Sequence, residues 1–407
     1  MRRNFVRSAG FAVMPLLCGV ACGLLSPGLR AQVTDGKKPE LPAPFASKAA
    51  NNSAEEAKAP EGFLPKVPEG FKINVFAADF KSPRWLTTAP NGDIFLADSA
   101  ANRVVVLRDP QHTGSAQQNE VFVSGLNQPY GIAFHDDYVY IGDTDALLRF
   151  KYDAKTSKRL GEAEKLLDLP GGGHWTRTLA IAPDGKHIYI AIGSNSNIDI
   201  ESDARRAAIT VCDLDGKNAR LYATGLRNPS GLGIEPVSGA LWTAVNERDN
   251  LGNDLPPDYF TSVKDGGFYG WPYSYIGNNV DPRVKPQKPE LTAKAIIPDV
   301  LLGAHRAPLG FAFYTGKQFP ESYRGGAFLA EHGSWNRTPR AGYQVVFIPF
   351  KGGKASGDPV PFLTGLVPDV NKPEVYGRPV GITVTADGSL LVSDDTAGVV
   401  YRVSVAK

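Results

Sequence analysis

A motif that recurs six times along the chain restricts the possible folds to very few. Each copy has a short apolar strand, a turn with Gly or Asp-Gly, a second apolar strand and a polar turn, and four copies begin with Pro-x-Gly. The copies begin at Pro83, Pro129, Thr176, Pro229, Pro308 and Pro379. The first three separations, of 46, 47 and 53 residues, each fit one four-stranded blade. Because a closed ring buries the faces of such repeats and protects their edges, the motif predicts an all-β, six-bladed β-propeller of four-stranded antiparallel blades over residues 70–407.

Two segments beside the repeats complete this prediction. Residues 71–80, FKINVFAADF, precede the first full copy, and we expect them to supply the outer strand of the last blade and close the ring. Residues 246–288 lie in the 79-residue separation between the fourth and fifth copies and show no strand–turn–strand alternation. We interpret them as a long loop, which in a compact domain is usually functional or disordered.

The first 31 residues are typical of an export signal. Three arginines precede the apolar stretch FAVMPLLCGVACGLL, which is too short for a firm membrane span, and Ala31 offers a cleavage point. RRNFVR resembles a twin-arginine signal, and an ordinary secretory signal is the alternative. A lipoprotein acylated at Cys22 is less favoured, because Gly19 stands where Leu is expected. We therefore predict a periplasmic or secreted protein with no membrane span after signal removal.

Charge and cysteine content narrow the class of protein further. Residues 1–31 hold four arginines and no acidic residue, so the remainder of a chain with a net charge of +2 carries −2. This balance argues against a nucleic-acid partner, since no basic excess remains. Cys212 is the only cysteine after the signal, so the mature chain forms no internal disulfide. Residues 32–69 are rich in Pro, Ala and Lys and predict a flexible tether.

Polar residues stand directly before the inner strands of the predicted blades. In repeat order they are Ser82, Gln128, His174–Trp175, Arg227–Asn228, His305–Arg306 and Arg378. The inner strands of a propeller line its central channel, so these side chains converge at one mouth and predict a ligand pocket. Taken singly, each has the alternative role of capping a strand and satisfying loose backbone groups.

Two segments of the long loop add candidate chemistry. Asn246–Asp254, NERDNLGND, is dense in oxygen ligands and suits a hard cation such as Ca²⁺, although a solvated acidic loop is an equal alternative. Gly267–Tyr275, GFYGWPYSY, holds five aromatic residues. These either stack on a flat cofactor or sugar ring or bury the long loop against the ring.

Five segments resemble the soluble quinoprotein sugar dehydrogenases, a family that includes soluble glucose dehydrogenase, aldose sugar dehydrogenases and the sorbosone dehydrogenase group. They are GLRNPSGL, HWTRTLAIAPDG, GFYGWPYSY, AEHGSWNR and GRPVGITVTADGSLLVSDDT, and the resemblance spans Phe71 to Val405. It implies a six-bladed propeller that holds pyrroloquinoline quinone (PQQ) and Ca²⁺ at one end of the channel.

The resemblance also implies roles for particular residues. His174 matches the catalytic base, which takes the proton from the C1 hydroxyl of a sugar. Ca²⁺ is implied at the backbone carbonyls of Glu247 and Arg248, besides the cofactor itself. Arg337 is a substitute for a cofactor lysine of the fifth blade that has no clear match here. Cofactor contacts are implied for Gln128, Arg227, Asn228, Arg337 and Arg378.

Three positions depart from the family pattern. Thr178 stands where the glucose-oxidising members have Arg, Val380 where a second cofactor arginine is expected, and Gly173 where an Asp often precedes the histidine. These departures weaken PQQ binding as a prediction and argue against glucose as the substrate.

The sequence thus predicts an exported PQQ-dependent oxidoreductase. It would oxidise an aldose or sugar aldehyde at C1 to the lactone or acid, transfer hydride to PQQ and reduce an external electron acceptor such as a cytochrome. A non-catalytic propeller that binds a partner is the second interpretation. A calcium-dependent lactonase is the third, because the predicted mouth offers His and Arg instead of a carboxylate cluster.

Overall fold

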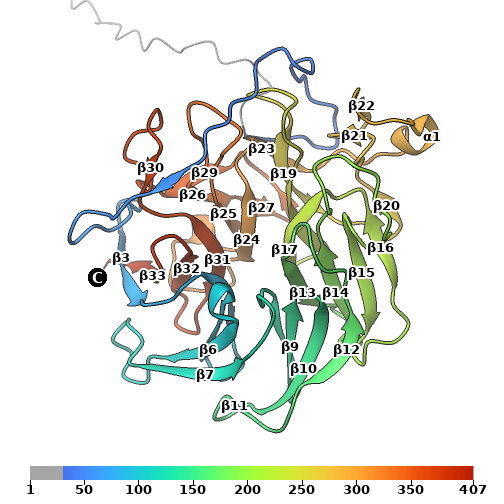
Figure 1. Ribbon diagram of the computed structural model, residues 1–407. Coiled ribbons are helices and arrows are strands. Elements are labelled where there is room, and N and C mark those ends of the chain that lie inside the picture. Colours follow the sequence, from blue (N-terminus) through green and yellow to red (C-terminus); the bar gives the residue numbers. More distant parts are fainter. Residues whose placement is uncertain (1–30, 407) are drawn as a thin grey trace, which may run out of the picture.

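The computed structural model describes residues 31–406, and six antiparallel sheets form a closed ring in it (Figure 1). The predicted six-bladed β-propeller is confirmed. Apart from Ala31, the predicted signal peptide lies outside the described residues. Within residues 31–406, no helix has the length and hydropathy needed to cross a membrane.

The first three blades follow one another without a long interruption. Blade one comprises β4 (Pro83–Thr88), β5 (Ile94–Asp98), β6 (Arg103–Arg108) and β7 (Gln118–Ser124). Blade two comprises β8 (Ile132–His135), β9 (Tyr138–Asp143), β10 (Ala146–Asp153) and β12 (Glu164–Asp168), with β11 (Lys158–Arg159) also paired to β10. Blade three comprises β13 (Arg177–Ile181), β14 (His187–Ile192), β15 (Ala208–Asp213) and β16 (Arg220–Thr224).

The last three blades carry the insertions. Blade four comprises β17 (Asn228–Ile234), β18 (Leu241–Asn246), β19 (Pro257–Ser262) and β23 (Val300–Ala304). Blade five comprises β24 (Pro308–Phe313), β25 (Ala327–Glu331), β26 (Gln344–Ile348) and β29 (Val360–Leu363). Blade six comprises β31 (Pro379–Val384), β32 (Leu390–Asp394), β33 (Val399–Val405) and β3 (Phe71–Ala77).

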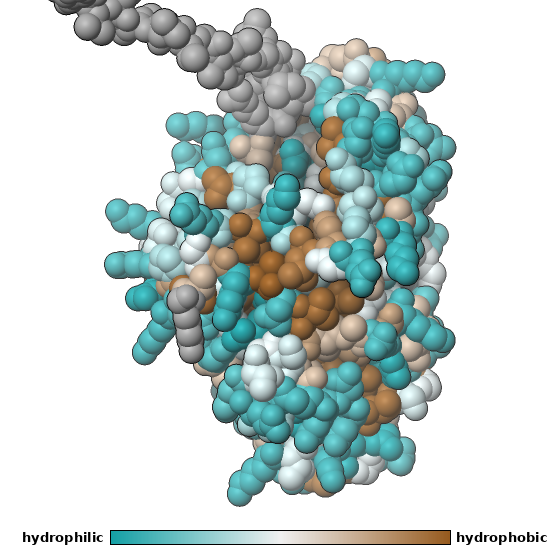
Figure 2. Space-filling view, turned by 90° about the vertical axis from the view of Figure 1, so that its left-hand side faces the viewer, coloured by the Kyte–Doolittle hydropathy of each residue, from teal (hydrophilic) through white to brown (hydrophobic). Residues whose placement is uncertain are grey.

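Ring closure follows the prediction. Strand β3 pairs antiparallel with β33, and Phe71 lies opposite Val405. The N-terminal end of the propeller thus supplies the outer strand of a blade whose other strands come from its C-terminal end. Phe71 also packs edge-on against Phe319 and Phe362 of blade five, so this strand covers the core between two blades. Figure 2, seen from the left-hand side of Figure 1, shows apolar side chains surrounded by hydrophilic ones on that face.

The glycines of the Pro-x-Gly copies explain how the ring packs at its axis. A Cβ at Gly131, Gly231, Gly310 or Gly381 would lie 2.2–2.5 Å from a backbone oxygen on the inner strand of the next blade. Real Cβ atoms do not come so close, so only glycine lets neighbouring inner strands approach to this distance. Glycine is therefore required at this position of the repeat because two blades meet there, and not because the chain turns.

The prediction of a long loop over residues 246–288 was partly wrong. Residues 257–262 form β19, the third strand of blade four, and the fourth strand, β23, follows only at residue 300. The intervening insertion contains β20 (Gly267–Phe268), β21 (Ser274–Tyr275), β22 (Asn279–Val280) and the helix α1 (Pro289–Thr292). The sequence hides β19 because its apolar residues, Tyr259 and Phe260, are adjacent and lie on both buried faces instead of alternating with exposed residues.

Residues 32–69, which we name the N-terminal strap, lie along the rim rather than apart from it. Strand β1 (Gln32–Val33) pairs with β23 of blade four, and β2 (Glu55–Glu56) pairs with β30 (Glu374–Val375) between blades five and six. The blue trace of Figure 1 follows this path. The sequence predicted a flexible tether because the segment lacks hydrophobic periodicity, and its order comes instead from backbone hydrogen bonds to the rim loops.

The remaining strands, β27 (Phe350–Lys351) and β28 (Lys354–Ala355), form a hairpin on blade five. Two short 3-10 helices span Ser99–Ala101 and Glu321–Tyr323. Cys212 on β15 is buried and free, and burial raises the pKa of its thiol to about 11. The thiol is therefore protonated and poorly reactive at neutral pH.

Candidate functional site at the mouth of the channel

A cavity of about 210 Å³ lies at one mouth of the central channel. Its walls come from blades three to six. The polar and aromatic side chains that line it are His174, Arg227, Asn246, Glu247, Asp249, Asp258, His305, His332, Trp335 and Arg378. The structure thus brings together five residues singled out from sequence, His174, Arg227, Glu247, His305 and Arg378. Gln128, Arg337, Asn228 and Arg248 are not among the lining residues.

The His174 side chain is held in one tautomer. Its Nδ1 lies 2.8 Å from the carbonyl oxygen of Ser194, and because a carbonyl only accepts, Nδ1 carries the hydrogen. Nε2 is therefore left with its lone pair. Burial and then the positive charge of Arg227 lower the pKa of His174 to about 4, so the imidazole is neutral at physiological pH.

Gly193 makes room for this arrangement. A Cβ at Gly193 would lie 2.3 Å from Oδ1 of Asn228 and 2.6 Å from Cβ of His174. Asn228 therefore stands directly behind the histidine. Its Nδ2 faces Asn246 Oδ1 at 3.4 Å, whereas its Oδ1 is buried without a hydrogen-bond partner among the described residues. Ordered water or a bound ligand is the usual partner of such a buried acceptor.

Arg227 ties blade four to the loop that follows its second strand. Its guanidinium donates to the carbonyl of Glu247 at 2.8 Å and pairs with Asp249 at 3.2 Å. The side chain is 7% exposed, and burial lowers the pKa of the guanidinium, although it stays charged. A cation can stand at the start of this core strand because the loop supplies the oxygens that a buried cation needs.

Arg248 has a structural role through its side chain. Its guanidinium is fully buried and pairs with Glu247 at 2.9 Å and with Asp281 at 3.2 Å. It also donates to the carbonyls of Pro272 and Ser274, both at 2.6 Å. The aromatic segment 267–275 therefore wraps around Arg248 and is itself buried. Of the two interpretations of this segment, the structure favours burial of the long insertion.

Carboxylates also line the cavity, contrary to the sequence-based expectation of His and Arg alone. Asp258 accepts hydrogen bonds from the backbone N–H groups of Glu247 and Ala307, both at 2.7 Å, and burial raises its pKa to about 8. Asp249 is paired with Arg227. These carboxylates are thus already engaged, and the described residues contain no group of three or more His, Cys, Asp and Glu side chains arranged to hold a metal.

His332 is the main lining residue that sequence analysis missed. Its Nε2 lies 2.9 Å from Asp395 Oδ1, and Asp395 also pairs with Arg84. Burial, together with the charge of Arg378, lowers the pKa of His332 to about 4. Burial would raise the pKa of Asp395, but His332 and Arg84 outweigh this effect and hold it below its usual range. The Arg84 guanidinium lies over the Trp175 ring, 5.3 Å from its centroid.

His332 lies in AEHGSWNR, the segment in which a cofactor lysine of the fifth blade was sought. Arg337, the substitute that the sequence suggested, instead pairs with Asp254 at 2.7 Å. His332 directly follows the second strand of blade five, just as Glu247 follows the second strand of blade four. The mouth is therefore built both from residues before the first strands and from residues after the second strands. Applying the second rule to the sequence would have found His332.

The departures from the family pattern fit the local packing. Gly173 has a φ of 58°, and a Cβ there would lie 2.4 Å from the Cα of Asn195, so Asp is excluded. Val380 is fully buried on β31, and Thr178 donates from its hydroxyl to the carbonyl of Ser230 at 2.7 Å. Arg177 is fully buried and donates to the carbonyl of His174 at 2.7 Å. It supports the histidine rather than facing the cavity.

Acid should destabilise the ligand-free protein through His174. Folding lowers the pKa of this imidazole from 6.5 to about 4, so between these pH values the unfolded chain binds a proton that the folded chain does not. The stability contributed by the neutral imidazole is complete above pH 6.5 and is lost as the pH falls toward 4. We expect the free energy of unfolding of the parent to fall more from pH 7.5 to pH 5 than that of His174→Gln.

The comparison with a variant is needed because other groups titrate in the opposite sense. Burial raises the pKa of Asp258 to about 8 and that of Asp394 to about 7, so their contributions to stability grow as the pH falls. Urea unfolding of both proteins at each pH isolates the His174 contribution. A difference between parent and variant that does not change with pH would contradict the low pKa.

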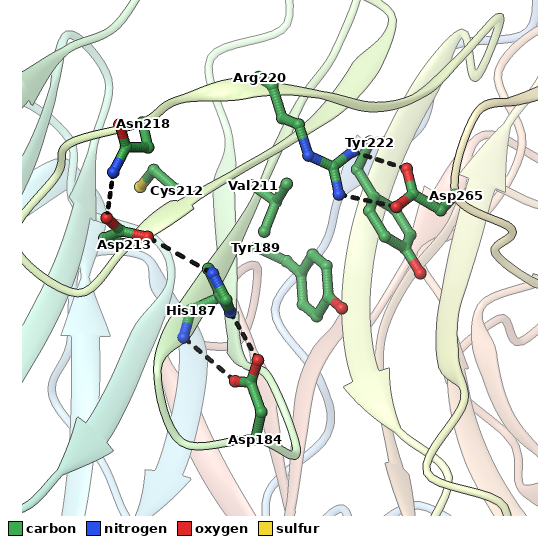
Figure 3. Close-up of a pocket in the computed structure, with 10 residues that line it drawn as sticks. All are labelled: Asp184, His187, Tyr189, Val211, Cys212, Asp213, Asn218, Arg220, Tyr222 and Asp265. Carbon is green, nitrogen blue, oxygen red and sulfur yellow. Dashed lines mark hydrogen bonds and ion pairs between the residues drawn. The ribbon is translucent and has the colours of Figure 1, made fainter.

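A larger hollow, of about 570 Å³, lies on the outer part of blade three (Figure 3). His187 stands between Asp184, at 2.6 Å, and Asp213, at 3.4 Å. On the other side of the hollow, Arg220 pairs with Asp265 at 2.6 Å. Each of these side chains already has a partner within the hollow. The axial cavity, which has the free Nε2 of His174 and lies next to the unpaired Oδ1 of Asn228, is therefore the better candidate for chemistry.

Comparisons with known proteins agree with this fold. A TrAA12-like family model matches residues 65–259 and 280–406. The chain therefore belongs to the TrAA12-like family. A protein of Borreliella burgdorferi described as uncharacterized is 29% identical over 358 residues, which cover 84% of this chain and 91% of that protein.

Relatives with a stated activity confirm the resemblance to quinoprotein sugar dehydrogenases. A pyrroloquinoline quinone-dependent pyranose dehydrogenase of Coprinopsis cinerea is 24% identical, over 82% of this chain and 54% of that protein. The chain thus spans about half the length of this relative. The calcium structure of a Trichoderma reesei enzyme of carbohydrate-active family AA12 superposes with a TM-score of 0.73 and 21% identity, covering 84% of this chain and 97% of the other.

Proposed function

We propose that this chain is an exported quinoprotein oxidoreductase that oxidises an aldose or sugar aldehyde at C1 to the lactone or acid, with hydride passing to PQQ. The observation that carries the proposal is the state of His174. It is a buried imidazole that is neutral, fixed by Ser194 and left with a free Nε2 in a cavity lined by Arg227 and Arg378. A proton acceptor and cationic groups in one small cavity suit oxidation of an alcohol.

The residues of the cavity fit PQQ, a flat quinone with three carboxylates. Arg378 would pair with a cofactor carboxylate, since its Nη1 has no partner among the hydrogen bonds of the described residues. Arg227 and Asn228 would lie beside the quinone, where the unpaired Oδ1 of Asn228 gains a neighbour. The backbone carbonyls of Glu247 and Arg248, with oxygens of the cofactor, would hold Ca²⁺. Bound PQQ supplies the hydride acceptor that the protein itself lacks.

His174 would act as the general base. Its Nε2 takes the proton of the C1 hydroxyl, while the Ser194 carbonyl keeps Nδ1–H in place. A pKa of about 4 means that the base is always available at neutral pH but is weak. The imidazolium formed beside Arg227 is unfavourable, so we expect its proton to leave quickly through the open mouth. The electrons then pass to an external acceptor such as a cytochrome.

A PQQ titration of the purified protein, with and without Ca²⁺, tests the proposal. We expect saturable, calcium-dependent binding and then dye reduction on addition of aldoses. Arg378→Ala should weaken PQQ binding by roughly tenfold or more, because a charge-assisted pair is lost. Arg402→Ala is the control, since Arg402 lies in the same blade but pairs with Asp387 away from the cavity. If the parent binds no PQQ, the polar mouth is a binding surface for another partner and the proposal fails.

A further inference from the structure

The N-terminal strap crosses the two loops that wall one side of the cavity. These are the loop of residues 249–254, which contains Asp249, and the loop of residues 334–340, which contains Trp335. Nearly all of the strap precedes residue 65, where the match to the family model begins. We propose that the strap positions these loops and thereby sets the size of the sugar that the site admits. This inference rests on the proposed function.

The strap holds the first loop through its backbone and one serine. The N–H of Phe45 donates to the carbonyl of Leu251 at 2.6 Å, and the N–H of Asn253 donates to the hydroxyl of Ser47 at 3.0 Å. Between these points the carbonyl of Gly252 lies 2.9 Å from Nε2 of His305, a cavity residue. A movement of the strap would therefore displace the Gly252 carbonyl, which contacts His305 directly.

The strap holds the second loop chiefly through Asn52. Its backbone N–H donates to the carbonyl of Trp335 at 2.7 Å, and its Nδ2 donates to the carbonyl of Arg337 at 2.9 Å. Arg340 in turn donates to the backbone oxygen of Asn52 at 2.7 Å and to its Oδ1 at 2.9 Å. Asn336 adds a bond from its Nδ2 to the carbonyl of Ala50 at 2.7 Å.

The two loops also bind each other. Arg337 pairs with Asp254 at 2.7 Å, and the N–H of Asn250 donates to Oδ1 of Asn336 at 2.8 Å. Strap and loops thus form one hydrogen-bonded wall. This wall includes Trp335 and contacts His305, whereas His174 is held by the Ser194 carbonyl of blade three. Loosening the wall should therefore alter substrate binding more than the catalytic base.

Trp335 gives the wall a means of recognising a sugar. Trp335 lines the cavity and is 42% exposed, whereas the other four tryptophans of the protein are buried or partly buried. An indole face held at the mouth of a cavity can pack against the apolar face of a sugar ring. The backbone of Asn52 fixes this loop through the Trp335 carbonyl. Because the cavity is small, at about 210 Å³, we expect monosaccharides to be preferred over disaccharides.

Asn52→Ala tests the inference, with Asn51→Ala as its matched control. Asn51 is exposed and its side chain makes no hydrogen bond among the described residues. Asn52→Asp keeps the acceptor for Arg340 but loses the donor to Arg337, so it should restore part of the effect. Three quantities are measured: hydrogen–deuterium exchange of residues 249–254 and 334–340 without ligand, PQQ affinity, and kcat and KM with the monosaccharide that the parent oxidises best and with maltose.

For Asn52→Ala we expect faster exchange in both loops, unchanged PQQ affinity and a monosaccharide KM raised by about three- to tenfold with little change in kcat, as for the loss of a few hydrogen bonds. The preference for monosaccharide over disaccharide should fall. Unchanged exchange, or faster exchange without a change in KM or preference, would overturn the inference. If the parent oxidises no sugar, the proposed function fails and the assignment of sugar size fails with it, while exchange still decides whether the strap holds the loops.

Discussion

Replacing His174 by alanine should lower kcat by about a hundredfold or more while PQQ binds as tightly as before. The substitution removes Nε2, the proposed proton acceptor. The Ser194 carbonyl keeps this nitrogen unprotonated by binding Nδ1–H, and Gly193 leaves room for the imidazole. Cofactor affinity should persist because Arg227 and Arg378 are anchored independently of the imidazole, Arg227 by the Glu247 carbonyl and Arg378 by the His332 carbonyl at 3.2 Å. Steady-state dye reduction and a PQQ titration measure the two quantities.

His187→Ala is the matched control for this experiment. His187 is also a blade-three histidine, but it lies in the outer hollow between Asp184 and Asp213 and is 43% exposed (Figure 3). We expect the kcat of His187→Ala to equal that of the parent. If His174→Ala kept its turnover, His174 would have no part in the proton transfer. His332, which also lines the cavity and has a pKa lowered to about 4, would then be the next candidate.

Replacing Arg248 by methionine should lower the free energy of unfolding by about 3–5 kcal/mol. The guanidinium is fully buried, as are the carboxylates of Glu247 and Asp281 that it joins. Asp281 keeps Arg283 at 2.8 Å, but Glu247 is left as a buried charge without a cation. The carbonyls of Pro272 and Ser274 also lose their donor. Urea unfolding of the ligand-free protein measures the effect.

Arg220→Met removes a guanidinium of the same kind from the surface. Arg220 and Asp265 form a bidentate pair, but their side chains are 55% and 51% exposed, so we expect a loss of less than about 1 kcal/mol. Equal losses for the two variants would mean that the Arg248 network does not bear on folding. Arg248→Met should in addition reduce the calcium dependence of PQQ binding, because it frees the turn whose carbonyls we propose as ligands.

The sequence was sufficient for the ring because its repeat has a physical cause. Each copy alternates between apolar strands and turns, and Pro-x-Gly marks the point where an inner strand meets its neighbour. The closing strand β3 could be recognised as well, since residues 71–80 have the pattern of an outer strand with no blade of their own. Strand β19 could not, because both of its faces are buried and its pattern has no period.

Only part of the site could be predicted from the sequence, because only some of its residues stand beside the repeat motif. Residues before the first strands, such as His174 and Arg227, stand beside a recognisable motif. Residues after the second strands, such as His332 and Asp395, do not, although they reach the same mouth. The strap was missed because its order depends on single hydrogen bonds, like those of Asn52, rather than on a pattern of apolar residues.

The glycines on the inner strands close the ring through backbone contacts, whereas different residues, at the mouth of the channel, line the ligand site. In GLRNPSGL, Arg227 lines the cavity and Asn228 packs behind His174. Three residues after Asn228, Gly231 packs against the backbone oxygen of Leu309. Contacts between backbone atoms of neighbouring inner strands thus set the width of the central channel. Natural variation or directed evolution can therefore exchange the side chains at the mouth, one blade at a time, without refitting the scaffold beneath them. Substrate preference in this architecture should diversify faster than the ring itself.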